Sequence, residues 1–402
     1  MSSSRLRARW LSGRLAAAFA LASVAACGGS SKPVAKPVKV KPAINADKLL
    51  GDARAAVAAG DKDGAHKNYL AYEKAKPTDV TVLGEHVDFL IKVGGIQDAV
   101  ATSKGYYEAH PTDMKGYHLY ANSLIAAGDF ATALDVTGQM LQLDENDAQA
   151  HEKRGRALIL AGKMDDGLEE LRKGATLAPQ DPQLLISLGS ALQRGGKPEE
   201  AALQLREAIK LAPEDARAHR LLGKALFDQV DLKEAQVYLT KATRLDPNDG
   251  GAWFDLGILL NKTGDNLGAE EALAQAVKVQ PKDATNWYAY GEMLRLNKKF
   301  DEAVEAYKQA MEATPPHKKA AAKRGIALFE AKRYGEAETF LTGVVRADPK
   351  NPYNYENLGV VYEFEKKYKL AIEMFEKFVE LADKEDGDLP KVKAKIKELK
   401  RK

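Results

Sequence analysis

The sequence predicts an all-α solenoid of about ten helix–turn–helix repeats, because three kinds of residue recur with a 34-residue period. Small residues occupy one column of this period in all ten repeats, from Ala65 to Ala371, with Gly167 as the only exception to alanine. Seven successive repeats carry glycine in a second column, from Gly155 to Gly359. The third column is proline, found at Pro77, Pro111, Pro179, Pro213, Pro247, Pro281, Pro315 and Pro349.

The small-residue columns predict two closely packed helices in each unit, and the third column predicts where the unit ends. A helical glycine costs about 1 kcal/mol relative to alanine, so seven of them imply a packing requirement that offsets the loss. Proline cannot continue the helical hydrogen bonds. An aspartate or asparagine two residues later is typical of a helix N-cap. Glu145 replaces proline in one unit, but Asp147 still supplies the cap, so we expect the stack to continue there. His317 stands at the cap position of unit nine.

The columns of the seventh unit, which include Trp253, Leu256, Gly257, Ala269 and Pro281, resemble the tetratricopeptide repeat. Ten units of this kind fit residues 46–385 without insertion. The resemblance implies a right-handed superhelical solenoid in which the first helix of every unit lines a concave groove. It also implies that other proteins or peptide segments bind in that groove.

The first 26 residues differ in composition from the repeats. A basic start is followed by an apolar run of 12 residues, whereas about 20 are needed to span a bilayer. Val24, Ala25 and Ala26 precede Cys27, the sole cysteine of the chain. These residues resemble a bacterial lipoprotein signal peptide, and the resemblance implies cleavage before Cys27 and acylation, including palmitate, at this residue. The alternative is an ordinary signal peptide that ends by chance at a cysteine.

Residues 27–45 predict a tether, because three Lys-Pro pairs favour an extended chain. An unstructured spacer without a tuned length is the alternative. In bacteria with two membranes, lipoproteins kept in the inner membrane usually carry aspartate after the cysteine, where this chain has Gly28. The resemblance therefore implies a lipid anchor in the cell envelope, at the periplasmic face of the outer membrane.

Reading the groove positions of the tetratricopeptide family onto this chain implies two zones of partner contact. A peptide with acidic and apolar parts would suit these two zones. For the basic zone, the alternative is that the charges are solvated or neutralised by nearby carboxylates. For the apolar zone, the alternative is that the side chains pack on the next unit. The basic zone comprises Arg156, Arg194, Arg217, Arg220 and Lys224. The apolar zone comprises Phe254, Ile258, Tyr288, Ile326, Tyr353 and Val360.

Residues 386–402 predict a basic amphipathic helix that caps the last unit. Leu389, Val392, Ile396 and Leu399 fall on one stripe, and the other face is rich in lysine. That face either keeps the cap soluble or contacts anionic lipid headgroups.

Catalysis is not expected, because the chain has no HExxH, P-loop, GxSxG or CxxC motif. The seven histidines fall at unrelated repeat positions, which does not favour a metal site. The net charge of +3 does not point to nucleic acid. We therefore expect no cofactor, no metal and no small-molecule substrate. The expected function is an envelope scaffold that binds protein partners and aids assembly of a secretion, pilus or other complex. The alternative is a substrate-recruiting or regulatory subunit of an envelope enzyme encoded on another chain.

Overall fold

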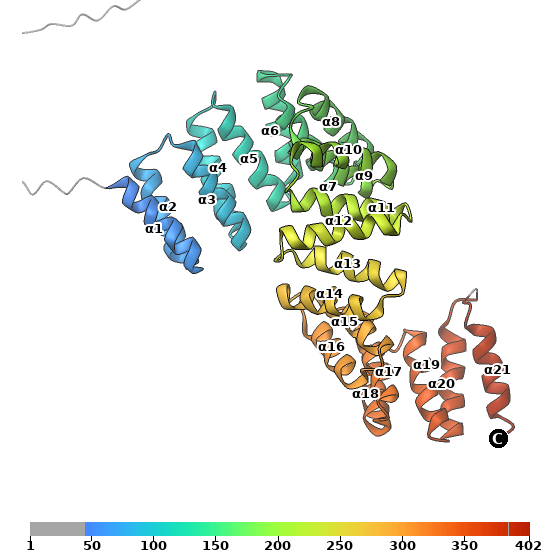
Figure 1. Ribbon diagram of the computed structural model, residues 1–402. Helices are drawn as coiled ribbons and strands as arrows, with labels where there is room; N and C mark the ends of the chain where they lie inside the picture. The colour runs from blue at the N-terminus through green and yellow to red at the C-terminus, as the bar shows by residue number, and fades with distance from the viewer. Residues whose placement is uncertain (1–44, 385) are drawn as a thin grey trace, which may run out of the picture.

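The computed structural model describes residues 45–384 and 386–402, and these residues form an all-α repeat solenoid. Figure 1 shows helix pairs stacked in chain order, from blue at the N-terminal side to red at the C-terminus. The signal peptide and most of the tether, with Cys27, lie outside the described residues. None of the described helices is both long and apolar enough to cross a bilayer.

Ten helix pairs followed by one final helix make up the described part of the chain. The first helices of the pairs are α1 (Ala46–Ala59), α3 (Val80–Val93), α5 (Met114–Ala127), α7 (Ala148–Leu160), α9 (Pro182–Arg194), α11 (Ala216–Asp228), α13 (Gly250–Thr263), α15 (Ala284–Leu296), α17 (Ala320–Glu330) and α19 (Pro352–Phe364). The second helices are α2 (Lys62–Ala75), α4 (Ile96–Ala109), α6 (Phe130–Leu143), α8 (Met164–Leu177), α10 (Pro198–Leu211), α12 (Leu232–Leu245), α14 (Asn266–Val279), α16 (Phe300–Glu312), α18 (Tyr334–Ala347) and α20 (Tyr368–Leu381). The final helix is α21 (Leu389–Leu399).

The first helices lie on the inner side of the curve. Each helix packs on its neighbours in sequence, but the stronger contacts between helices two apart join first helices, for example α5 with α7, α7 with α9 and α9 with α11. Since first helices approach one another more closely than second helices do, the array bends toward them. Their exposed side chains therefore face the groove.

The two helices of a unit touch at the predicted glycine column. A Cβ added to Gly223 would lie 2.7 Å from Cγ of Leu239, and one added to Gly291 would lie 2.8 Å from Cε1 of Tyr307. Nine of the ten small-column residues are alanines that are fully buried, including Ala235. The predicted close approach of the two helices is confirmed.

The turn between the two helices uses a left-handed residue at one position of every described unit. Gly264, for example, has φ of 88°, and its amide donates to the carbonyl of Asn261. Left-handed backbone favours glycine because it has no Cβ. Glycine fills this position in six units, whereas four units place another residue there: Val230, Lys298, Lys332 and Lys366.

In several units a main-chain carbonyl of the turn between units binds a side chain of the helix that follows. Indole Nε1 of Trp253 donates to the carbonyl of Pro247 at 3.0 Å, and Trp287 makes the same bond to Pro281 at 2.9 Å. Tyr117, His219 and Tyr355 reach the corresponding carbonyls six residues before them. The residue type of this column varies, but each of these side chains reaches the same acceptor.

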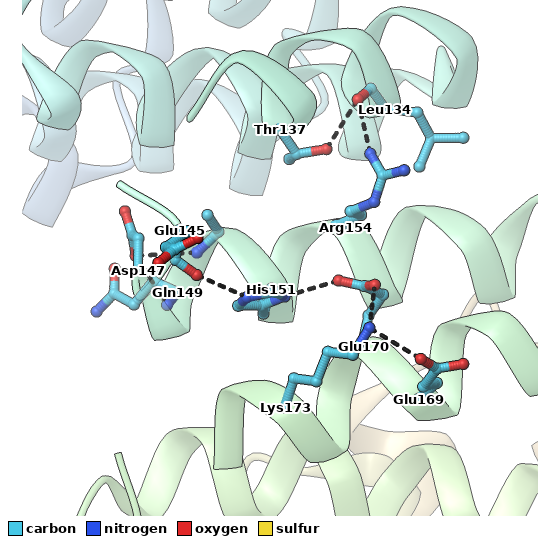
Figure 2. Close-up of polar contacts among 11 residues, drawn as sticks. Leu134, Thr137, Glu145, Asp147, Gln149, His151, Arg154, Glu169, Glu170 and Lys173 are labelled. Atoms are coloured by element: carbon cyan, nitrogen blue, oxygen red, sulfur yellow. Dashed lines mark hydrogen bonds and ion pairs between the residues drawn. The ribbon is translucent and has the colours of Figure 1, made fainter. Parts of the chain in front are cut away.

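The unit that lacks the proline keeps this contact. Figure 2 shows His151 between the carbonyl of Glu145 and the carboxylate of Glu170, at 3.2 and 2.7 Å. Asp147 caps α7 by accepting from the amides of Gln149 and Ala150, so the expected cap is confirmed. Arg154 of the same helix donates to the carbonyl of Leu134 on α6, so the helices remain stacked where the proline is missing.

Unit nine departs from the repeat. His317 does not cap α17, which begins at Ala320 with Lys319 before it and no side-chain cap. The His317 ring stacks instead on Tyr288 with centroids 3.9 Å apart, because the chain at 313–319 follows an irregular path. Beyond unit ten, α21 lies on α20 and buries Leu389, Val392 and Leu399.

Candidate binding groove

Three arginines from consecutive first helices converge on one cavity of about 220 Å³ in the groove. Arg156 comes from α7, Arg194 from the last turn of α9 and Arg217 from the first turn of α11. Two serine hydroxyls and four apolar side chains complete the lining: Ser187, Ser190, Ile159, Leu160, Leu171 and Ala191. The cavity combines positive charge with an apolar wall.

Within residues 45–384 and 386–402, only one of these arginines has a carboxylate partner. Arg156 Nη1 lies 3.4 Å from Oε1 of Glu152, which also accepts from the Ser187 hydroxyl at 2.9 Å. Arg194 and Arg217 are exposed, and no ion pair involves either within the described part of the chain. The cavity therefore keeps excess positive charge.

Arg220 and Lys224, the other members of the predicted basic zone, do not line this cavity. Arg220 Nε donates to Oδ2 of Asp255 at 2.7 Å, and its Nη1 lies 3.1 Å from Oδ1 of Asp249. Burial raises the pKa of the Asp255 carboxyl, although Arg220 acts in the opposite direction. Arg220 thus joins units six and seven. Its charge is neutralised by carboxylates, as the alternative interpretation of the basic zone expected. Lys224 is exposed near Asp255.

The apolar zone is divided among different environments. Phe254 and Ile258 are half-buried and pack on the central hydrophobic core. Tyr288 lines a cavity of about 680 Å³ together with His317. Val360 is exposed and lines none of the main cavities of the described chain.

Ile326 and Tyr353 line a cavity of about 900 Å³ between units nine and ten. Its wall includes Phe340 and Val344 of α18, so a second helix contributes to it. Val344 stands where the four preceding units have a fully buried alanine, such as Ala310. The Tyr353 hydroxyl donates to Asp386 at 2.7 Å, and this bond fixes one side of the opening.

Several lining residues were missed by reading only the groove columns of the first helices. Ser187 and Leu171 lie at other positions, and Phe340 belongs to a second helix. A signal for the large cavity was present in the sequence, because Ala321 and Ala322 put small residues where other units carry large ones. Within the described residues, no group of three or more histidine, cysteine, aspartate or glutamate side chains is arranged to hold a metal ion.

The fold and its groove define a helical-repeat solenoid of the class used for protein–protein interaction. The family model described as the Cilia and flagella-associated protein 70 C-terminal domain, a tetratricopeptide repeat model, matches residues 96–317, which is more than half of the chain. A second model, the Cytochrome c-type biogenesis protein H TPR domain, matches residues 270–389. The chain belongs to the tetratricopeptide repeat proteins.

Solved structures with the same fold include the APC/C hetero-tetramer Cut9–Hcn1, at 16% identity and a TM-score of 0.54, covering 83% of this chain and 59% of that one. IFIT1 matches at 16% identity and a TM-score of 0.53, covering 83% and 80%. PilF of Pseudomonas aeruginosa matches at 20% identity and a TM-score of 0.46, covering 50% and 90%. The likenesses to Cut9–Hcn1 and IFIT1 show the fold alone. No curated protein matches the chain significantly.

Proposed function

We propose that this protein is a lipid-anchored scaffold of the cell envelope that holds protein partners in its groove and helps an envelope complex to assemble, without catalysing a reaction. The observation that carries the proposal is the row of cavities along the inner helices: a basic one, a larger one around Tyr288 and His317 with several lysines in its wall, and a still larger one with an apolar wall that includes Ile326 and Phe340. Protein partners recognise such surfaces through apolar anchors and charge complementarity. A repeat array also offers a long surface on which more than one segment can bind.

The anchor is part of the proposal and rests on the sequence Val24-Ala25-Ala26-Cys27. Several acyl chains give stable membrane attachment, whereas a single chain gives only marginal binding. Cell fractionation tests it: the wild-type chain should sediment with membranes and incorporate labelled palmitate, and the Cys27→Ala variant should lose both properties. Membrane retention of Cys27→Ala would refute the anchor.

Partner binding is tested by photo-crosslinking in cells from a photoreactive residue placed at Tyr288 or Arg217. Arg217 is preferred to Arg220, because Arg220 is held by two carboxylates. The matched control is Arg244, an exposed arginine on α12, a second helix. We expect defined protein adducts from the two groove positions and none from Arg244. Equal labelling from all three positions, or none from the groove, would contradict a groove-binding scaffold.

A captured enzyme together with its substrate would instead favour a recruiting or regulatory subunit. The identity of the adducts therefore separates the two roles.

A further inference from the structure

The three-arginine cavity is built from residues whose charges repel one another unless something neutralises them. Arg156, Arg194 and Arg217 come from three different helices, so no single helix forces them together. Among the residues that the structure describes, Glu152 is the one carboxylate paired with any of them, and it also accepts from Ser187. Like charges at close range are unfavourable in the reduced dielectric of a cavity wall. An anionic group in the cavity would remove this cost.

The lining also bears on the kind of anion. The planar guanidinium of arginine presents paired N–H donors that match two oxygens of a carboxylate or of a phosphate, so the arginines alone do not choose between them. Ser187 and Ser190 add hydroxyl groups to the same lining. The adjacent wall of Ile159, Leu160 and Leu171 gives apolar contact to methylene groups next to the charge. A glutamate side chain has both parts, whereas inorganic phosphate would leave the apolar wall unused.

The size of the cavity agrees with a single side chain. Its volume of about 220 Å³ is below the range of roughly 300–1,000 Å³ typical of cofactor and drug-sized ligand sites. The cavity is open to the groove along three successive first helices, where a passing chain can insert a residue.

We propose that this cavity is a receptor for one acidic residue, glutamate or aspartate, of a protein segment that crosses α7, α9 and α11. The proposal rests on the proposed function, since it names the chemistry of a protein partner. Arg194 and Arg217 hold the carboxylate, and Arg156 exchanges part of its contact with Glu152 for the incoming group.

The first test is selection from a randomised peptide library by the full chain held in detergent. We expect selected peptides to share an acidic residue at one fixed position. The triple variant R156Q/R194Q/R217Q should lose that preference, and Arg244→Gln, the same change on a second helix, should keep it. Thermal unfolding of each variant verifies folding. Selection without an acidic position, selection that is unchanged in the triple variant, or no selection by the wild-type chain would overturn the proposal.

The second test is a double-mutant cycle on a selected peptide, measured by fluorescence anisotropy. Changing the acidic residue to its amide, or Arg194 to glutamine, should each weaken binding by roughly 10- to 100-fold, the range for a charge-assisted hydrogen bond. The two changes together should weaken it little more than either alone. Additive losses would overturn the assignment of this arginine to this carboxylate.

Two further measurements test two other possible occupants of the cavity, inorganic phosphate and a lipid headgroup. Inorganic phosphate should displace the peptide no better than sodium chloride of equal ionic strength, and stronger displacement would overturn the proposal in favour of a phosphate site. Vesicles containing phosphatidylglycerol should bind wild-type and R217Q chains equally, and Arg217-dependent vesicle binding would overturn it in favour of a lipid headgroup. In-cell adducts from Tyr288 that persist in the triple variant would leave the scaffold function intact even if this inference fails.

Discussion

Replacing Val230 by glycine should stabilise the protein. Val230 fills the left-handed turn between α11 and α12 with φ of 66°, and 69% of its surface is exposed. Left-handed backbone costs an L-residue about 1–2 kcal/mol, and a β-branched side chain lies toward the upper end. Glycine also has more conformational freedom in the unfolded chain, and this offsets about 0.5–1 kcal/mol of the stabilisation. Little burial is lost, so the net gain in the free energy of unfolding should be about 1 kcal/mol.

The measurement is chemical denaturation followed by far-ultraviolet circular dichroism, with native-state hydrogen exchange of the amides in α11 and α12. Exchange resolves the local effect, because a repeat array can unfold in parts. A gain of about 1 kcal/mol should slow exchange through local opening about 5-fold.

Two further variants make this reasoning refutable. Gly264→Val places the same side chain at the same position of the next unit, where an added Cβ has no atom within 4 Å, and backbone strain should produce a net loss of about 1 kcal/mol. Val237→Gly removes a similarly exposed valine, 65% exposed, from the interior of α12 and should also be destabilising. If Val230→Gly were no more stable than wild type while Gly264→Val were harmless, the strain argument would be wrong.

Three other predictions concern packing, ion pairing and pH. Gly155→Ala should lower the free energy of unfolding measured by denaturation by about 2 kcal/mol, because the new Cβ would lie 2.8 Å from the Gly167 carbonyl oxygen. The same change at Gly105, which has open space around it, should raise the free energy of unfolding by about 1 kcal/mol. Arg220→Met should cost about 2 kcal/mol, since it leaves the carboxyl of Asp255 without its partner, and the double variant R220M/D255L should recover much of this. Burial lowers the pKa of His118 below its ordinary 6.5, with a smaller contribution from the charge of Lys153. The unfolded chain then binds the proton more readily, so stability should fall as the pH drops through about 6.5, and fall less in His118→Gln. Equal pH profiles for the two proteins would contradict this assignment.

The helical framework could be predicted from sequence because its signals are local and repeated. Gly223 and Ala235 report one close approach, and the same pair of columns recurs in the other units, so that chance agreement is excluded. Asp147 likewise predicts a helix start without its proline, since capping involves only the next few amides.

The distribution of charge in the groove could not be predicted in the same way. Arg217 and Arg220 lie on one turn of α11, yet Arg217 has no carboxylate partner among the described residues, whereas Arg220 is held by Asp249 and Asp255 of the next unit. The difference depends on which way each side chain points across the boundary between units. The large cavity beside Val344 also depends on how two units meet, and a column-by-column reading treats each unit alone.

The contact that His151 makes with the Glu145 carbonyl has a consequence for how such an array can change its length. Its acceptor belongs to the main chain, so any residue may occupy that position without removing it. Tryptophan, tyrosine and histidine all serve as the donor in other units, for example Trp253 and Tyr355. A contact of this kind does not depend on which two repeat units it connects. Duplication or excision of a unit that carries such a donor would therefore keep this contact, and the array could be lengthened or shortened by whole units of that kind.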